Sequence, residues 1–174
     1  NMIEAHIKDG VAVTKFLYWI KNSNIRKLDE IKVEKKLESF RKQSKNYLFP
    51  SFSTIAGSGP NGAIIHYRSN KKSNRKLNKD HLLLVDSGGQ YKWGTTDITR
   101  TISFSDPSKK TKELYTRVLK GHIAVAMSKI DKLKNGNNID KLARKSLNSI
   151  NLDYRHGTGH GVGFFMNVHE GPQS

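Results

Sequence analysis

The sequence predicts an α+β fold, and three observations support this prediction. Apolar residues recur at helical spacing in the first 40 residues, two β-prone runs surround residue 90, and helical periodicity returns after residue 107. The chain has 174 residues and 35% hydrophobic content, which suits one domain, or part of one, with a packed core. Because no apolar run approaches the roughly 20 residues of a membrane-spanning helix, we expect no membrane partner.

Two helices are expected near the N-terminus. The first, residues 3–20, is predicted to bury the face formed by its recurring apolar residues, which are Ile3, Ile7, Val11, Leu17 and Ile20. The second is predicted to begin after Asp29, a residue type that caps helix N-termini. Neither helix carries a functional signal, so we expect both to be scaffold.

The middle of the chain is expected to form strands. Residues 47–67 contain glycines and prolines between short β-prone runs, and we expect residues 63–67 to be a strand that carries His66. The apolar residues 82–86 and the Thr- and Ile-rich residues 97–104 are expected to pair as an antiparallel hairpin.

Two further helices are expected after this hairpin. Asp106 is predicted to cap a long helix that has Pro107 at its first position and runs toward Ile130. Residues 134–138 are predicted to form a loop, and a last helix is expected over residues 139–147.

The sequence is strongly basic, with 31 Lys and Arg against 15 Asp and Glu and a formal net charge of +16. Such a charge could indicate a polyanion partner. However, the densest basic run, residues 71–79, has no aromatic residues on which bases could stack, so we expect a solvated loop and no nucleic-acid binding. With no cysteine and no visible export signal, a cytoplasmic location is expected.

Asp86 and Asp97 are the first candidates for chemistry. They lie at the end of one predicted strand and the start of its partner, so a hairpin would bring both carboxylates to one side of the sheet. Such a pair is costly unless a cation lies between the carboxylates, and hard divalent ions accept carboxylate oxygens. Acidic residues beside turns are also common caps and turn formers, so the spacing alone leaves both interpretations open.

Three histidines, His156, His160 and His169, lie in or beside a glycine-rich segment. Four glycines between His156 and Gly163 allow the backbone close to a ligand, which favours a binding site. The alternative is a tight turn in which the histidines are hydrogen-bonded scaffold. A dinucleotide-binding loop is a poorer alternative, because no strand-to-helix unit with a downstream acidic residue accompanies the glycines.

Three segments resemble consecutive signatures of the Xaa-Pro aminopeptidases, also called aminopeptidase P. They are SFSTIAGSGPNGAIIHYR, LLLVDSGGQYKWGTTDITRTISF and HGTGHGVGFFMNVHEGP, and the opening EAHIKDG resembles the first helix of that family's catalytic domain. The resemblance implies the pita-bread fold, which has two pseudo-symmetric α+β halves and is shared with creatinase, prolidase and methionine aminopeptidase. The first half would cover about residues 1–135, and the second would start at about residues 136–174.

The resemblance also implies a centre with two divalent metal ions, for which Mn²⁺ is favoured over Co²⁺ or Zn²⁺. Asp86 is implied to bind one ion, Asp97 to bridge both ions and His160 to bind the second. His66 and His169 are implied to be catalytic residues that contact substrate and assist proton movement. His156 resembles a further substrate-pocket histidine.

The implied activity is removal of the first residue from peptides with proline in second position. The family's last two metal ligands are glutamates downstream of the NVHEGP motif, and no match to them precedes residue 174. We therefore expect a partial catalytic domain, truncated at both ends relative to the family and inactive alone. The alternatives are a prolidase-like dipeptidase, a methionine aminopeptidase and a non-catalytic pita-bread module that binds histones, RNA or protein. A homodimer of the full-length protein is left open.

Overall fold

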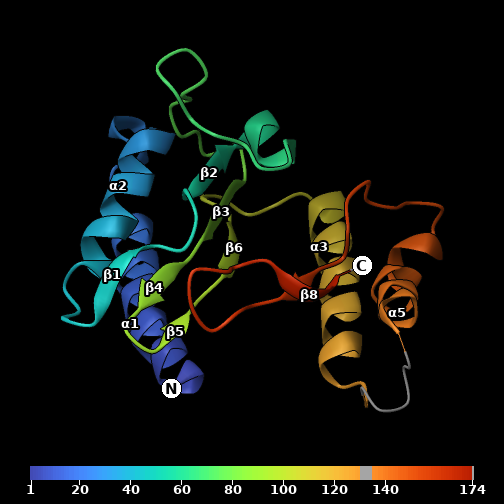
Figure 1. The fold of residues 1–174 in the computed structure, drawn as a ribbon. Helices are drawn as coiled ribbons and strands as arrows, with labels where there is room; N and C mark the ends of the chain where they lie inside the picture. The colour runs from blue at the N-terminus through green and yellow to red at the C-terminus, as the bar shows by residue number, and fades with distance from the viewer. Residues whose placement is uncertain (130–134, 174) are drawn as a thin grey trace. The chain divides into compact units, whose positions relative to one another are not determined.

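The computed structural model describes residues 1–129 and 135–173, which form helices and small antiparallel sheets as the sequence predicts (Figure 1). The chain divides into two compact units. The first comprises residues 1–105 and 162–169, and the second comprises residues 106–161 and 170–174. The division into pseudo-symmetric halves near residue 135 stays a prediction.

The first unit contains most of the regular structure. Its helices are α1 (Met2–Lys21) and α2 (Glu30–Arg41), with short 3-10 turns η1 (Ile25–Lys27) and η2 (Gly59–Ala63). Its strands are β1 (Tyr47–Pro50), β2 (Ile55–Ser58), β3 (Leu83–Ser87), β4 (Gly89–Tyr91), β5 (Gly94–Thr95) and β6 (Ile98–Ile102). The second unit contains α3 (Lys109–Ala126), α5 (Gly136–Asn148), β7 (His160–Gly161) and β8 (Glu170–Gln173). Among the described residues, no helix is long and apolar enough to cross a membrane.

Two three-stranded sheets lie in the first unit, with strand orders β2-β3-β6 and β1-β4-β5. The predicted antiparallel pairing is confirmed, because β3 pairs with β6 and Asp86 lies opposite Thr99. The connection is longer than a simple hairpin turn. It contains β4 and β5, which pair with each other and join the second sheet through β1.

The core of the first unit is formed by α1, α2 and one face of the β2-β3-β6 sheet. Its buried apolar residues are Val13, Phe16, Ile20, Val33, Leu37, Ala56, Leu77, Leu83, Val85 and Ile102. Full burial of a large apolar side chain contributes about 1.5–3 kcal/mol, so this set fixes which face of β3 lies inside. Because side chains alternate along a strand, Asp86 lies on the opposite face from Leu83 and Val85.

Helix α1 is confirmed, and so is the burial of Ile20 and, in part, of Leu17, but the predicted buried face is wrong over the first half of the helix. Ile3, Ile7 and Val11 are 78%, 61% and 51% exposed. The face that is buried consists of Ala5, Asp9, Ala12, Val13, Phe16 and Ile20. The charged Asp9 can lie inside because Arg41 Nε donates to its carboxylate at 2.6 Å.

Helix α2 begins as predicted, because the Asp29 side chain accepts a hydrogen bond from the Lys32 backbone N–H at 2.9 Å. The predicted cap of α3 is wrong. Ser108, rather than Asp106, is the N-cap, because its hydroxyl accepts the backbone N–H of Thr111 in the first turn, and this places Pro107 outside the helix. Ile130, toward which α3 was expected to run, lies outside the described residues.

The predicted loop over residues 134–138 is wrong over residues 136–138, because α5 already begins at Gly136. The Asn135 side chain accepts the Asn138 backbone N–H at 3.2 Å, so Asn135 acts as the N-cap. Residue 134 lies outside the described residues. The predicted helix over residues 139–147 is confirmed as part of α5.

The expected strand over residues 63–67 is also wrong. The segment is a turn in which the Tyr67 N–H donates to the Ile64 carbonyl at 3.2 Å and His66 has a φ of 53°. Ile64 and Ile65 are exposed, so their β-branched side chains find no core to pack against. The Tyr67 hydroxyl instead donates to buried Glu30 at 2.7 Å, and Tyr67 is the buried residue of this segment.

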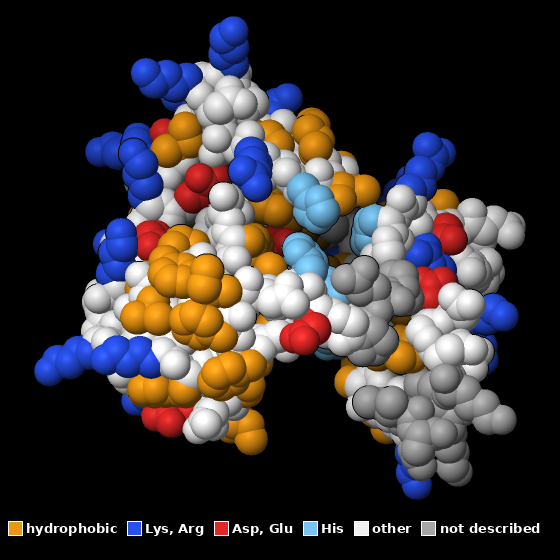
Figure 2. Space-filling view, viewed as in Figure 1, with side chains coloured by type: hydrophobic (Ala, Val, Ile, Leu, Met, Phe, Trp, Pro, Cys, Tyr) orange, Lys and Arg blue, Asp and Glu red, His pale blue; other side chains and the backbone are white. Residues whose placement is uncertain are grey.

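The basic run over residues 71–79 is a loop with mostly exposed side chains, although Leu77 is buried in the core. Figure 2 shows that Lys and Arg side chains of the first unit project separately on the drawn face and form no continuous patch.

Replacement of Lys71, Lys72, Lys76 and Lys79 with glutamine is expected to change the free energy of unfolding by less than about 0.5 kcal/mol each, because exposed charges interact weakly. Chemical denaturation measures this. Leu77→Ala in the same loop is the control, with an expected cost of about 2–5 kcal/mol. A large loss of nucleic-acid affinity in the glutamine variant would contradict the interpretation of this run as a solvated loop.

Candidate metal centre

Asp86 and Asp97 lie on one side of the β2-β3-β6 sheet. Asp86 is opposite Thr99, whose hydroxyl donates to Asp86 Oδ1 at 2.8 Å. Asp97 directly precedes β6, two residues before Thr99, so the side-chain alternation of β6, continued by one residue, places it on the face shared by Thr99 and Asp86. Both aspartates are partly exposed. The register of β3 and β6 is therefore compatible with two neighbouring carboxylates, and their role as a pair stays a prediction.

The backbone at Gly88, after β3, packs closely against the backbone at Thr96, before β6. Each of these residues lies close in sequence to one of the two aspartates. A Cβ atom at Gly88 would collide with the Thr96 carbonyl oxygen, so this position requires glycine. The same carbonyl accepts a hydrogen bond from Ser51 Oγ at 2.8 Å, and Gly89 N–H donates to Thr96 Oγ1 at 2.9 Å. These contacts restrict the movement of the two strand ends relative to each other.

His66 and His169 lie beside each other in the first unit. Their ring centroids are 6.2 Å apart and the ring planes meet at 62°. Both side chains are exposed. The segment that ends at His169 is attached to β4, because buried Gln90 Oε1 accepts the Met166 backbone N–H at 2.9 Å. The structure therefore places His66 and His169 side by side. The resemblance implies that both residues contact the substrate.

Glu30, which the sequence analysis missed, organises the turn that carries His66. Its side chain is fully buried and accepts hydrogen bonds from the Ser58 N–H at 2.8 Å, Asn61 Nδ2 at 2.9 Å and the Tyr67 hydroxyl at 2.7 Å. Burial raises the pKa of Tyr67, and the contact with Glu30 raises it further, so the phenol remains a donor. In the sequence, Glu30 has the pattern of an exposed residue in the first turn of a helix.

In the second unit, His160 and His156 make the same kind of hydrogen bond. Nδ1 of His160 lies 2.8 Å from the Gly161 carbonyl oxygen, and Nδ1 of His156 lies 2.7 Å from that of Gly157. Because a carbonyl oxygen can only accept, each neutral ring carries its proton on Nδ1 and its lone pair on Nε2. Histidines that bind metals commonly have this arrangement, with the second ring nitrogen held by a backbone carbonyl.

Arg144 in α5 holds the chain before and within the glycine-rich segment, and the sequence analysis missed it too. It donates to the carbonyl oxygens of Tyr154 and His156, both at 2.7 Å, and its guanidinium lies 4.0 Å from the centroid of the Tyr154 ring. Its Nε donates to Asp140 at 2.7 Å. Hydrogen bonds from Thr158 and Arg144 lower the pKa of Asp140, which keeps this carboxylate ionised.

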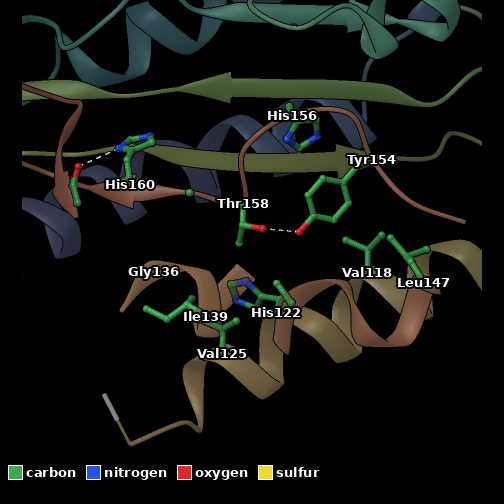
Figure 3. Close-up of a pocket in the computed structure, with 13 residues that line it drawn as sticks. Val118, His122, Val125, Gly136, Ile139, Leu147, Tyr154, His156, Thr158 and His160 are labelled. Atoms are coloured by element: carbon green, nitrogen blue, oxygen red, sulfur yellow. Dashed lines mark hydrogen bonds between the residues drawn. The ribbon is translucent and has the colours of Figure 1, made fainter. Parts of the chain in front are cut away.

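The second unit contains an open cavity of about 590 Å³ between α3, α5 and the glycine-rich segment (Figure 3). Val118 of α3 and Leu147 of α5 line the helix side, and Tyr154, His156 and His160 line the segment side. The ring of Tyr154 stacks on that of His156, with centroids 4.7 Å apart. The cavity therefore leaves space beside both imidazoles within this unit.

Within residues 1–129 and 135–173, no three His, Asp or Glu side chains form a group that could hold one metal ion. The predicted ligands Asp86 and Asp97 belong to the first unit, and His160 belongs to the second. As a donor set, two carboxylates and an imidazole nitrogen fit a divalent ion such as Mn²⁺. The complete ligand set stays a prediction.

The sequence matches metallopeptidase family M24 over residues 1–174, and the chain belongs to this family. It is 48% identical over 179 residues to aminopeptidase P2 of Arabidopsis thaliana and covers 25% of that protein. It is 46% identical over 178 residues to Xaa-Pro aminopeptidase 1 of Dictyostelium discoideum and covers 28% of it. These alignments include 100% and 99% of the present chain. The predicted resemblance to Xaa-Pro aminopeptidases is confirmed.

Solved structures confirm the pita-bread fold. The X-prolyl aminopeptidase of Caenorhabditis elegans, described as a cytosolic enzyme with a dinuclear active site, is similar with a TM-score of 0.88 and 37% identity. The match covers 98% of this chain and 28% of that one. An Xaa-Pro dipeptidase of Bacillus anthracis is similar with a TM-score of 0.82 and 28% identity, over 97% of this chain and 45% of that one.

Proposed function

We propose that the native protein containing this segment is a two-metal aminopeptidase that removes the first residue of peptides with proline in second position. The observation that carries the proposal is the shared sheet face of Asp86 and Asp97, because two neighbouring carboxylates are stabilised by a cation between them. The names of the relatives at 46% and 48% identity support the substrate class.

Three residues of this chain are proposed as metal ligands. Asp86 would hold one ion, Asp97 would be shared by both ions, and His160 would hold the second ion through Nε2. The Thr99 hydroxyl orients the Asp86 carboxylate, and the Gly161 carbonyl orients the His160 ring. When bound, a divalent pair supplies a water whose pKa is lowered toward neutrality. We propose Mn²⁺ as the native metal, with Co²⁺ and Zn²⁺ as alternatives for the same donors.

Three histidines are proposed to contact the peptide. Imidazole N–H groups of His66 and His169 stabilise negative charge that develops on a carbonyl oxygen of the substrate. Their ring centroids, 6.2 Å apart, lie close enough for both rings to contact one bound peptide. His156 is proposed as a further residue of the substrate pocket. Its ring stacks on Tyr154, which limits the number of rotamers that it can adopt.

The native protein is expected to hydrolyse a tripeptide with proline second in the presence of Mn²⁺, and to lose this activity when the metal is removed by a chelator. A tripeptide with alanine second is the matched control and should be cleaved more slowly. Chromatographic detection of the released first residue measures the rate.

Two other outcomes would overturn this proposal. Cleavage confined to an Xaa-Pro dipeptide would support the prolidase-like alternative. The structural similarity to the Bacillus anthracis dipeptidase favours this alternative as the second candidate. Absence of both hydrolysis and Mn²⁺ binding would support the non-catalytic binding module.

We also propose a cytoplasmic location and peptide rather than nucleic-acid partners. The absence of cysteine and the cytosolic description of the Caenorhabditis elegans enzyme support the location. The separate projection of basic side chains in Figure 2 supports the choice of partner. Fluorescence microscopy of the tagged native protein tests the location, and signal confined to another compartment would contradict it.

A further inference from the structure

Four polar side chains form a fully buried cluster in the first unit, behind the sheet face that carries the aspartate pair. They are Asp9 of α1, Arg41 of α2, Tyr91 of β4 and Thr96. Arg41 donates to both Asp9 oxygens, from Nε at 2.6 Å and from Nη2 at 3.1 Å. The Tyr91 hydroxyl donates to Oδ1 at 2.9 Å and the Thr96 hydroxyl to Oδ2 at 2.7 Å, so each carboxylate oxygen accepts two hydrogen bonds.

This cluster contacts the chain directly next to each proposed metal aspartate. Arg41 Nη2 donates to Ser87 Oγ at 3.0 Å, and Ser87 is the residue after Asp86. Thr96, which donates to Asp9, is the residue before Asp97. Ser87 is buried on the face of β3 opposite to Asp86, and Thr96 is fully buried directly before the partly exposed Asp97, so the cluster holds the buried neighbour of each aspartate.

Stability alone does not account for this arrangement. Removing two charges from water is costly, and well-packed apolar residues can replace a buried ion pair without loss of stability. Arg41 Nη1 adds to the cost, because it is buried and has no hydrogen-bond partner among the described residues. Burial raises the pKa of Tyr91, and the Asp9 charge raises it further, so Tyr91 stays a neutral donor to this carboxylate.

We propose that the buried Asp9–Arg41 pair is a positioning device that sets the spacing of the Asp86 and Asp97 carboxylates for metal binding. The proposal rests on the proposed function, because it requires these aspartates to be ligands. The pair acts through Thr96 and through the residue after Asp86, and it does not touch substrate. Its contribution is to prevent the two strand ends from moving apart before the metals bind.

Thr96→Val tests this most directly, because it keeps the side-chain shape and removes the hydroxyl that links Asp9 to the segment before Asp97. The native protein carrying this change is expected to bind Mn²⁺ with a Kd about 10–100-fold higher, as removal of an outer partner of a metal ligand commonly does. Thr96→Ser keeps the hydroxyl and is expected to restore the Kd to near its original value. Calorimetric titration of the metal-free protein with Mn²⁺ measures both.

A second measurement separates positioning from general destabilisation. Val33→Ala removes core methyl groups of α2, away from the cluster, and is expected to lower the Tm of the metal-free protein without changing the Kd for Mn²⁺. Ser87→Ala, which removes the Arg41 contact at the other aspartate, is a milder variant that is expected to raise the Kd in the same direction as Thr96→Val.

The outcomes separate this proposal from the function on which it rests. An unchanged Kd in folded Thr96→Val and Ser87→Ala, with normal metal binding by the unsubstituted protein, would overturn the positioning role alone. An equal rise in Kd for Val33→Ala at an equal loss of Tm would also overturn it, because the effect would then be general. Absence of Mn²⁺ binding by the unsubstituted protein would overturn the proposed function together with this inference.

Discussion

Replacement of Asp97 with asparagine is expected to abolish hydrolysis of Xaa-Pro peptides by the native protein and to release metal from it. An asparagine offers one neutral oxygen, whereas a bridging ligand must supply an anionic oxygen to each ion. Loss of a metal contribution of several kcal/mol corresponds to a fall in rate on the order of 10³-fold or more. Turnover and metal content per chain, measured on the same sample, test both parts.

Two further substitutions make this test specific. Asp106→Asn changes an exposed aspartate that pairs with the exposed Lys112, so turnover and metal content should both stay unchanged. His169→Ala should retain the metals and lower turnover about 10²–10³-fold, because an imidazole that stabilises the oxyanion is not a ligand. Unchanged turnover in Asp97→Asn with full metal content would remove Asp97 from the centre, and loss of metal in His169→Ala would contradict the role of His169.

The sheet face of the aspartate pair could be predicted from the sequence because its determinants are local. The apolar run before Asp86 and the β-branched run after Asp97 each have strand character, and the glycines between them allow the chain to turn. The register of the antiparallel pair then determines the face on which each aspartate lies. A shift of the register by one residue would expose the apolar side chains of β3.

The supporting residues could not be predicted, because their determinants are distant in sequence. Asp9 is 32 residues from Arg41 and 87 from Thr96, and nothing near it indicates that a charge lies in the core. Three isoleucine and valine residues of α1 therefore suggested the wrong buried face. Glu30 was missed for the same reason, and its contact with Tyr67 explains why residues 63–67 turn instead of forming a strand.

A chain of residues 1–174 produced alone is expected to be catalytically silent and only marginally stable. The resemblance implies a centre with five protein ligands, and no match to the two glutamates among them lies within residues 1–174. Three of five ligands should bind Mn²⁺ much more weakly. Apolar side chains are also exposed at Phe164, Phe165 and Met166 and along α3, and β7 and β8 form a sheet of only two strands in the described part of the chain. Such surfaces and open strand edges favour association.

The test compares this 174-residue chain with the native protein that contains it, both supplied with Mn²⁺. The short chain is expected to show no hydrolysis of a tripeptide with proline second, a lower Tm and concentration-dependent association in sedimentation experiments. The native protein carrying Asp97→Asn is the control, because it keeps every other residue of the native protein while the proposed metal bridge is broken. This variant is expected to be stable and monodisperse but equally inactive, which would separate the loss of activity from the loss of stability. Robust activity of the short chain at ordinary Mn²⁺ affinity would show that its own residues suffice, and the requirement for further glutamates would then be wrong.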